Sequence, residues 1–249
     1  GYDVFVSDFG AIAEHYKQQL SDWNIRFEEK QHTEAEILKA VEVIKSPGIP
    51  EKSPVIKKIK EKGIPGISER EFAGRYTNAK IGGITGSNGK TTTTSLTYHI
   101  LKNAGLNVGL AGNIGKSFAY QVATEKFDIY VLELSSFMLD DMFDFKVDIA
   151  VLLNITPDHL DRYDYKFENY AASKFRISQN QTADSYFIYC ADDPETVKGM
   201  QGRSFAAKLL PFSIEKKVDE GAYLEDNNSI IHVHQQLFKM SINDLALQG

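Results

Sequence analysis

Short apolar runs alternate with longer amphipathic stretches along the chain. The strand-like runs are residues 4–6, 41–44, 81–85, 106–110, 129–134, 149–154 and 186–189, and the helix-like stretches are 12–20, 54–62, 91–104 and 170–176. This alternation predicts an α/β fold with a largely parallel sheet, because parallel neighbours are joined by a crossover that is usually a helix. Residues 222–240 alternate around Asp226-Asn227-Asn228 and predict a small antiparallel hairpin.

Composition and charge narrow the class of protein. Hydrophobic residues make up 42% of the 249 residues, which is enough for a packed core and argues against disorder. The net charge of -6, with lysines spread along the chain, gives no reason to expect a nucleic-acid partner. No apolar run approaches the roughly 20 residues of a membrane helix, so we expect no membrane partner. The single cysteine, Cys190, allows no intrachain disulfide, and we expect a cytoplasmic protein.

The strongest local motif is the turn Gly86-Ser87-Asn88-Gly89-Lys90-Thr91-Thr92, between an apolar run and a helix-like stretch. Its glycines let the backbone curl so that N–H groups point at an anion, and the helix adds the positive end of its dipole. Lys90 would then face the β- and γ-phosphates, and the Thr91 hydroxyl would bind Mg²⁺. Ile84 stands where the strict Walker pattern requires glycine, so a plain glycine turn before a threonine-rich helix is the alternative.

Three ionisable residues farther along the chain are candidates for the same site. Glu133 ends an apolar run at the edge where parallel sheets bind ligands; it either holds Mg²⁺ or faces solvent. His159 lies in the polar loop after the run 149–154 and is either a site residue or an ordinary loop residue. Lys174 lies in the predicted helix 170–176 and reads as a surface or phosphate-facing lysine, since an ammonium group cannot ligate a metal.

Together these pieces resemble the Mur ligase family over nearly the whole chain. Residues 85–91 are similar to that family's own variant of the phosphate loop. Four further stretches resemble the branch that adds D-glutamate: Ser46-Pro47-Gly48-Ile49-Pro50, Gly112-Asn113-Ile114-Gly115, Leu132-Glu133-Leu134-Ser135-Ser136-Phe137 and Asn154-Ile155-Thr156-Pro157-Asp158-His159-Leu160-Asp161-Arg162-Tyr163. Sister ligases vary in the two longer stretches, so the resemblance is specific within the family.

The resemblance implies a division into domains. Residues 1–78 would form a truncated Rossmann-like domain for a UDP-linked substrate. Residues 79–249 would form a P-loop-type central ATP-binding domain, with a mostly parallel sheet and a small antiparallel hairpin region. The polar stretch 68–80 would include a helical linker near the boundary. We also expect the chain to be a piece of a longer protein, inactive alone, without an opening strand and a C-terminal amino-acid-binding domain.

The resemblance also implies a reaction. The γ-phosphoryl group of ATP would move to the carboxylate of UDP-N-acetylmuramoyl-L-alanine, and the amine of D-glutamate would attack the resulting acyl phosphate. Lys90 would stabilise the transferring phosphate. Thr91 and Glu133 would hold a first Mg²⁺, and Glu133 and His159 a second. In this family a lysine at the position of Lys174 carries a carbamate formed with CO₂.

Substrate contacts and alternatives follow from the same resemblance. Asp8, Ser46, Asn113, Ser135 and His159 would contact the UDP-linked substrate, and we expect a monomer. The alternatives are another amino-acid-adding Mur ligase, a folylpolyglutamate synthase, and a nucleotide-binding module without ligase activity.

Overall fold

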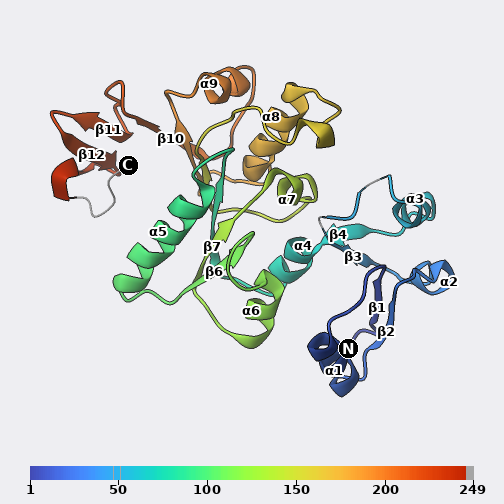
Figure 1. The fold of residues 1–249 in the computed structure, drawn as a ribbon. Coiled ribbons are helices and arrows are strands. Elements are labelled where there is room, and N and C mark those ends of the chain that lie inside the picture. The colour runs from blue at the N-terminus through green and yellow to red at the C-terminus, as the bar shows by residue number, and fades with distance from the viewer. Residues whose placement is uncertain (47, 51, 245–249) are drawn as a thin grey trace. The chain divides into compact units, whose positions relative to one another are not determined.

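The computed structural model describes residues 1–46, 48–50 and 52–244 (Figure 1). The chain divides into two compact units, Gly1–Ser68 and Glu69–Gly249, and each contains a hydrophobic cluster of its own. Among the described residues, no helix combines the length and the apolar character needed to cross a membrane.

The first unit consists of two short β-α-β segments in its described residues. β1 (Phe5–Asp8) lies parallel to β2 (Arg26–Glu29) with α1 (Glu14–Asp22) between them in sequence, and β3 (Val43–Lys45) lies parallel to β4 (Gly66–Ser68) with α3 (Pro54–Glu61) between them. The short helix α2 (Glu34–Ile37) connects the two segments. The apolar residues of α3 recur at helical spacing, so one face of this helix is buried: Val55, Ile56 and Ile59.

The second unit is built on one sheet, which has nine strands in the described chain, in the order β13-β12-β11-β10-β9-β8-β5-β7-β6. Its parallel part comprises β5 (Lys80–Thr85), β6 (Val108–Gly112), β7 (Ile129–Glu133), β8 (Ile149–Leu152), β9 (Tyr186–Cys190), β10 (Lys208–Ser213) and β11 (Gly221–Glu225). The strands β12 (Asn228–Val233) and β13 (Gln236–Ser241) continue it in antiparallel pairs. The predicted α/β fold, with a mostly parallel sheet and an antiparallel hairpin region, is confirmed.

Helices cover both faces of the parallel sheet (Figure 1). Helix α5 (Lys90–Asn103) packs on one face, and the other face carries α4 (Glu69–Gly74), α6 (Phe118–Thr124), α7 (Ser136–Asp140), α8 (Phe167–Phe175) and the end of α9 (Pro194–Met200). Strand β7 shows why its apolar run is continuous. Tyr130 and Leu132 enter the larger cluster, whereas Val131 points to the α5 side, so side chains of both orientations are buried.

Three strands lie outside the predicted runs, and each has a physical explanation. β4 has the sequence Gly-Ile-Ser directly after Pro65, so its single apolar residue gives no alternating pattern. β2 reads Arg-Phe-Glu-Glu, and three charged residues in four hide its strand character. β10 contains Pro211, which interior strands usually exclude because proline cannot donate to the ladder. Gly221 approaches this residue closely, since an added Cβ there would lie 2.0 Å from the Pro211 carbonyl oxygen. The helix suspected within residues 68–80 is α4, at Glu69–Gly74.

Candidate active site

Three parallel strand ends bring the candidate residues to one edge of the sheet. β5 lies between β7 and β8, so their carboxyl ends are neighbours. The predicted phosphate loop follows β5, Glu133 is the last residue of β7, and Asn154 follows β8. Hydrogen bonds between these three ends hold the site together.

The loop has the backbone of an anion cradle. Gly86 has a φ of +155° and Gly89 a φ of +79°, a left-handed conformation that glycine adopts without strain, and α5 begins directly afterwards. In the described part of the chain, the backbone N–H groups of residues 89–92 donate to no protein acceptor. Lys90 Nζ donates to the Ser87 carbonyl oxygen at 2.8 Å and so lies folded over the loop. Unpaired N–H groups at a helix start suit phosphate oxygens.

The loop after β8 braces the cradle from the side. Asn154 Oδ1 accepts the N–H groups of Ser87 and Asn88 at 3.1 and 2.9 Å, and Asn154 Nδ2 donates to the Asn88 carbonyl at 3.1 Å. The Thr156 N–H donates to Ser87 Oγ at 2.9 Å, and Asn88 Nδ2 donates to Thr156 Oγ1 at 3.1 Å. The N–H groups of Ser87 and Asn88 are therefore occupied by the protein, and the unpaired donors begin at Gly89.

A buried carboxylate faces the first turn of α5. Glu133 is 1% exposed; its Oε2 accepts from Thr91 Oγ1 at 2.8 Å and its Oε1 from Asn113 Nδ2 at 2.7 Å. Asn113 reaches this position because Gly112 has a φ of +102°, and an added Cβ there would lie 2.2 Å from the Glu133 carbonyl oxygen. The solvent-facing reading of Glu133 is therefore wrong.

The donor set around Glu133 suits one kind of cation. In the described residues, no three or more His, Cys, Asp and Glu side chains form a metal-binding group. The Glu133 carboxylate and the Thr91 hydroxyl provide oxygen ligands only. Mg²⁺ is bound by one or two carboxylates or hydroxyls and completes its shell with water and substrate phosphates.

Lys174 lies beneath the loop and not on the surface. Its side chain is 2% exposed, and its Nζ donates to the Gly86 carbonyl at 2.9 Å. Burial, with a smaller contribution from the nearby positive charge of Lys90, lowers the pKa of Lys174 to about 7, against the opposing effects of Asp158 and Asp140. The surface reading is therefore wrong, and the loop-facing reading fits.

Tyr170, one helical turn before Lys174, is a site residue that the sequence did not reveal. Its hydroxyl lies 2.9 Å from Ser87 Oγ, and Lys174 Nζ lies 5.1 Å from the centre of its ring. The i, i+4 spacing of these two residues on α8 was the available signal, since it places both side chains on one helix face.

His159 lies at the same sheet edge but not on the buried carboxylate. Its backbone is left-handed, with a φ of +49°, and its exposed imidazole lies 3.6 Å from Asp158 and 5.3 Å, between ring centres, from Phe137. In the described chain, no hydrogen bond joins His159 to Glu133 or Thr91. Ser135 ends the segment after Glu133 and caps α7, with its Oγ accepting from the Met138 N–H at 3.3 Å.

Two predicted substrate contacts belong to the first unit. Asp8 is exposed at the end of β1, where its Oδ1 accepts from the Gly10 N–H at 2.7 Å. Ser46 is exposed after β3, and its carbonyl accepts from the Ile49 N–H at 3.0 Å.

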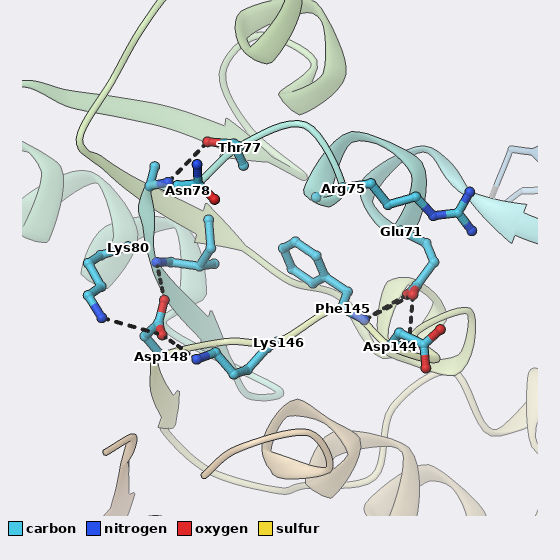
Figure 2. Close-up of a pocket in the computed structure, with 12 residues that line it drawn as sticks. Glu71, Arg75, Thr77, Asn78, Lys80, Asp144, Phe145, Lys146 and Asp148 are labelled. Carbon is cyan, nitrogen blue, oxygen red and sulfur yellow. Dashed lines mark hydrogen bonds and ion pairs between the residues drawn. The ribbon is translucent and has the colours of Figure 1, made fainter. Parts of the chain in front are cut away.

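A cavity of about 440 Å³ lies elsewhere in the second unit (Figure 2). It is lined by α4, the following linker, the start of β5 and the segment before β8, including Phe145 and Asp148. The amino ends of parallel strands lie opposite their carboxyl ends, so this cavity is at the far edge of the sheet from the phosphate loop. This cavity is therefore separate from the candidate active site.

Comparison with known proteins gives the class to which this fold and site belong. The model of the Mur ligase middle domain matches residues 84–247, and the model of the MurD N-terminal domain matches residues 1–55. The chain belongs to the Mur ligase family. The resemblance inferred from the phosphate loop and the motifs after the strands is confirmed.

Individual relatives narrow the comparison. The chain is 54% identical to the UDP-N-acetylmuramoylalanine–D-glutamate ligase of Christiangramia forsetii over 249 residues, 100% of this chain and 56% of that protein. It thus spans about half the length of the curated relatives it matches.

Two solved structures share the fold. A UDP-N-acetylmuramate:L-alanyl-γ-D-glutamyl-meso-diaminopimelate ligase from Neisseria meningitides has a TM-score of 0.60 and 15% identity, covering 93% of this chain and 77% of that one. A MurF ligase from Thermotoga maritima in complex with ADP has a TM-score of 0.51 and 21% identity, covering 96% of this chain and 54% of that one.

Proposed function

We propose that the complete protein uses ATP to join D-glutamate to UDP-N-acetylmuramoyl-L-alanine, a step in building the peptidoglycan precursor. The observation that carries the proposal is the cradle of unpaired N–H groups after Gly89, with the Thr91 hydroxyl bound to the buried Glu133 carboxylate. The 54% identity to a ligase of that name supports the choice of substrates, and a family member in complex with ADP supports the nucleotide.

The proposed chemistry proceeds in two steps. The substrate carboxylate attacks the γ-phosphorus of ATP, the bond to the β–γ bridging oxygen breaks, and an acyl phosphate and ADP form. The amine of D-glutamate then attacks the acyl carbon, loses a proton, and the tetrahedral intermediate expels phosphate to leave an amide. Both steps gather negative charge, which positioned donors stabilise most effectively. Lys90 and the N–H groups of residues 89–92 are the donors for the phosphates.

The first cation site in this proposal consists of Thr91 and Glu133, and Glu133 and His159 would help to hold a second cation. When bound, Mg²⁺ would neutralise the phosphate oxygens. The oxygen-only donor set fits this ion. Asn113 keeps the Glu133 carboxylate oriented, because it holds Oε1 while Oε2 faces Thr91.

Lys174 fits a carbamate. A carbamate forms when an uncharged amine attacks CO₂ and releases a proton, so an ordinary lysine is unreactive near neutral pH. The lowered pKa of Lys174, about 7, leaves about half of its amines uncharged there. The product would be an oxygen anion beside the phosphate loop, a group that Mg²⁺ accepts.

The remaining assignments complete the proposal. Residues 1–78 would bind the UDP-linked substrate, with Asp8 and Ser46 among its contacts, and residues 79–249 would bind ATP. Asn113, Ser135 and His159 would contact the muramoyl part, and a C-terminal domain would bind the amino acid. We further propose a monomer that works in the cytoplasm.

Phosphate release by the complete natural protein tests the proposal. We expect release only when Mg-ATP, UDP-N-acetylmuramoyl-L-alanine and D-glutamate are all present. L-lysine, diaminopimelate and D-alanyl-D-alanine serve as control acceptors, and folate with L-glutamate as a control pair. A preference for any control would assign another ligase, and ATP hydrolysis that ignores both substrates would indicate a nucleotide-binding module.

A further inference from the structure

Arg162 is a cation beside the candidate active site that the mechanism above does not use. It lies in the short 3-10 helix Leu160–Arg162, three residues after His159. Its guanidinium carbon lies 4.7 Å from the centre of the Phe137 ring. In the described part of the chain, no carboxylate pairs with Arg162 and no acceptor receives a hydrogen bond from its side chain. An exposed cation is therefore held in place with its N–H donors available.

The Phe137 ring that contacts Arg162 also contacts a predicted site residue. Phe137 also lies 5.3 Å, between ring centres, from His159 and stacks on Tyr163 at 6.2 Å with 11° between the planes. Tyr163 is buried, and its hydroxyl donates to Asp140 at 2.7 Å and lies 3.2 Å from Ser173 Oγ. The aromatic base of Arg162 is thereby anchored to α8 at the residue before Lys174.

Stacking on an aromatic ring leaves the edge of a guanidinium open. That edge presents paired donors that match the two oxygens of a carboxylate or phosphate, and the stacked plane has already lost much of its rotational freedom. A lysine could supply the charge here but neither the plane nor the paired donors. The arrangement is suited to bind an oxyanion at the sheet edge that carries the candidate site.

We propose that Arg162, supported by Phe137, binds an oxyanion of the amine or acyl substrate and thereby selects acidic substrates. The inference rests on the proposed ligase function. Two sources share this chemistry: a carboxylate of the incoming amino acid, and a carboxylate or diphosphate of the UDP-linked substrate. This proposal does not assign ATP to Arg162, because Lys90 and the N–H groups at the start of α5 are the proposed donors to its phosphates.

Steady-state kinetics of Arg162→Gln and Arg162→Lys in the complete natural protein test the proposal. The matched control is Arg203→Gln, because the Arg203 guanidinium lies at the same 4.7 Å from an aromatic ring, that of Phe175, but between α9 and β10, toward the opposite sheet edge. Loss of charge-assisted hydrogen bonds predicts a KM raised roughly 10- to 100-fold for one substrate in Arg162→Gln. The KM of Arg162→Lys for that substrate should lie between those of wild type and Arg162→Gln. The KM for ATP should stay within about twofold of the wild-type value.

The substrate whose KM rises identifies the source of the oxyanion. A raised KM for D-glutamate assigns its carboxylate. If the KM for the UDP-linked substrate rises, binding of its alaninamide analogue, which lacks the alanyl carboxylate, is measured next. If Arg162→Gln binds this analogue more weakly than wild type to the same degree, the oxyanion is the diphosphate. If its affinity for the analogue is unchanged, the oxyanion is the alanyl carboxylate.

The proposal is overturned if Arg162→Gln matches Arg203→Gln for both substrates, or if only the KM for ATP rises. If Arg162→Gln does not fold, Arg162→Lys is judged by the same criteria. An inactive wild type would instead contradict the ligase function.

Discussion

At the scale of single residues, burial decides the chemistry. The residue types of the phosphate loop indicated its role because glycine, lysine and threonine are themselves the functional groups. Lys174 was different, since nothing in Tyr-Ala-Ala-Ser-Lys-Phe-Arg says that the ammonium lies against the Gly86 carbonyl. The role of Lys174 came from resemblance, and its lowered pKa required the packing. Gly112 is a similar case, because only the structure shows what its missing Cβ avoids.

Lys174 should make the stability of the protein depend on pH. Its pKa falls from 10.5 to about 7 on folding, so between these values the unfolded chain binds more protons, and the free energy of unfolding rises with pH. Below pH 7 the folded state bears the full cost of a buried charge, on the order of 5 kcal/mol at about 1.4 kcal/mol per pKa unit. Lys174→Met removes this cost, so it should be more stable than wild type at pH 6, with the difference shrinking toward pH 10.

Denaturant unfolding in CO₂-free buffer measures that difference, and Lys80→Met serves as a control because its side chain is 75% exposed. A Lys174→Met difference that stays constant from pH 6 to pH 10 would argue against a buried amine of lowered pKa.

At the scale of elements, the hydrophobic pattern predicted the helices and strands whose apolar residues recur with a clear period. β5, α5 and β7 were predicted within two residues of their ends, because their apolar runs have a clear period and glycine marks their limits. β10 was missed because it contains Pro211, and β2 because it is mostly charged. The brace between the loops after β5 and β8 was also unpredictable, since it depends on which strands become neighbours.

Removing that brace should weaken nucleotide binding. Asn154→Ala takes away the acceptor for two loop N–H groups and the donor to a third loop group, so the cradle loses its fixed shape. At about 1 kcal/mol for each hydrogen bond, we expect the Kd for Mg-ATP to rise about tenfold or more in calorimetric titration. Asn180→Ala is the matched control, because its side chain also donates to backbone groups, the Phe143 and Phe145 carbonyls, but away from the loop. Equal affinities in the two variants would refute this role.

At the scale of the whole molecule, one topological fact creates the site. Parallel strands that are distant in sequence end at the same edge, so the loop after β5, the carboxylate of β7 and the loop after β8 become neighbours. The sequence predicted this edge because the candidate groups each follow an apolar run. It did not predict that His159 would lie on Phe137 apart from Glu133, since the path of a loop is not fixed by its composition.

We propose that Thr91 and Glu133 hold one cation on the triphosphate, and a double-mutant cycle is the most direct test of this arrangement. Mg-ATP affinity is measured by calorimetry for the wild-type complete protein, Thr91→Val, Glu133→Gln and the double variant. Because both residues bind the same ion, we predict that each single variant lowers the affinity for Mg-ATP. The double variant should bind Mg-ATP only slightly more weakly than the single variant with the lower affinity. Strictly additive losses, or affinities that do not change when Mg²⁺ is withheld, would contradict the account.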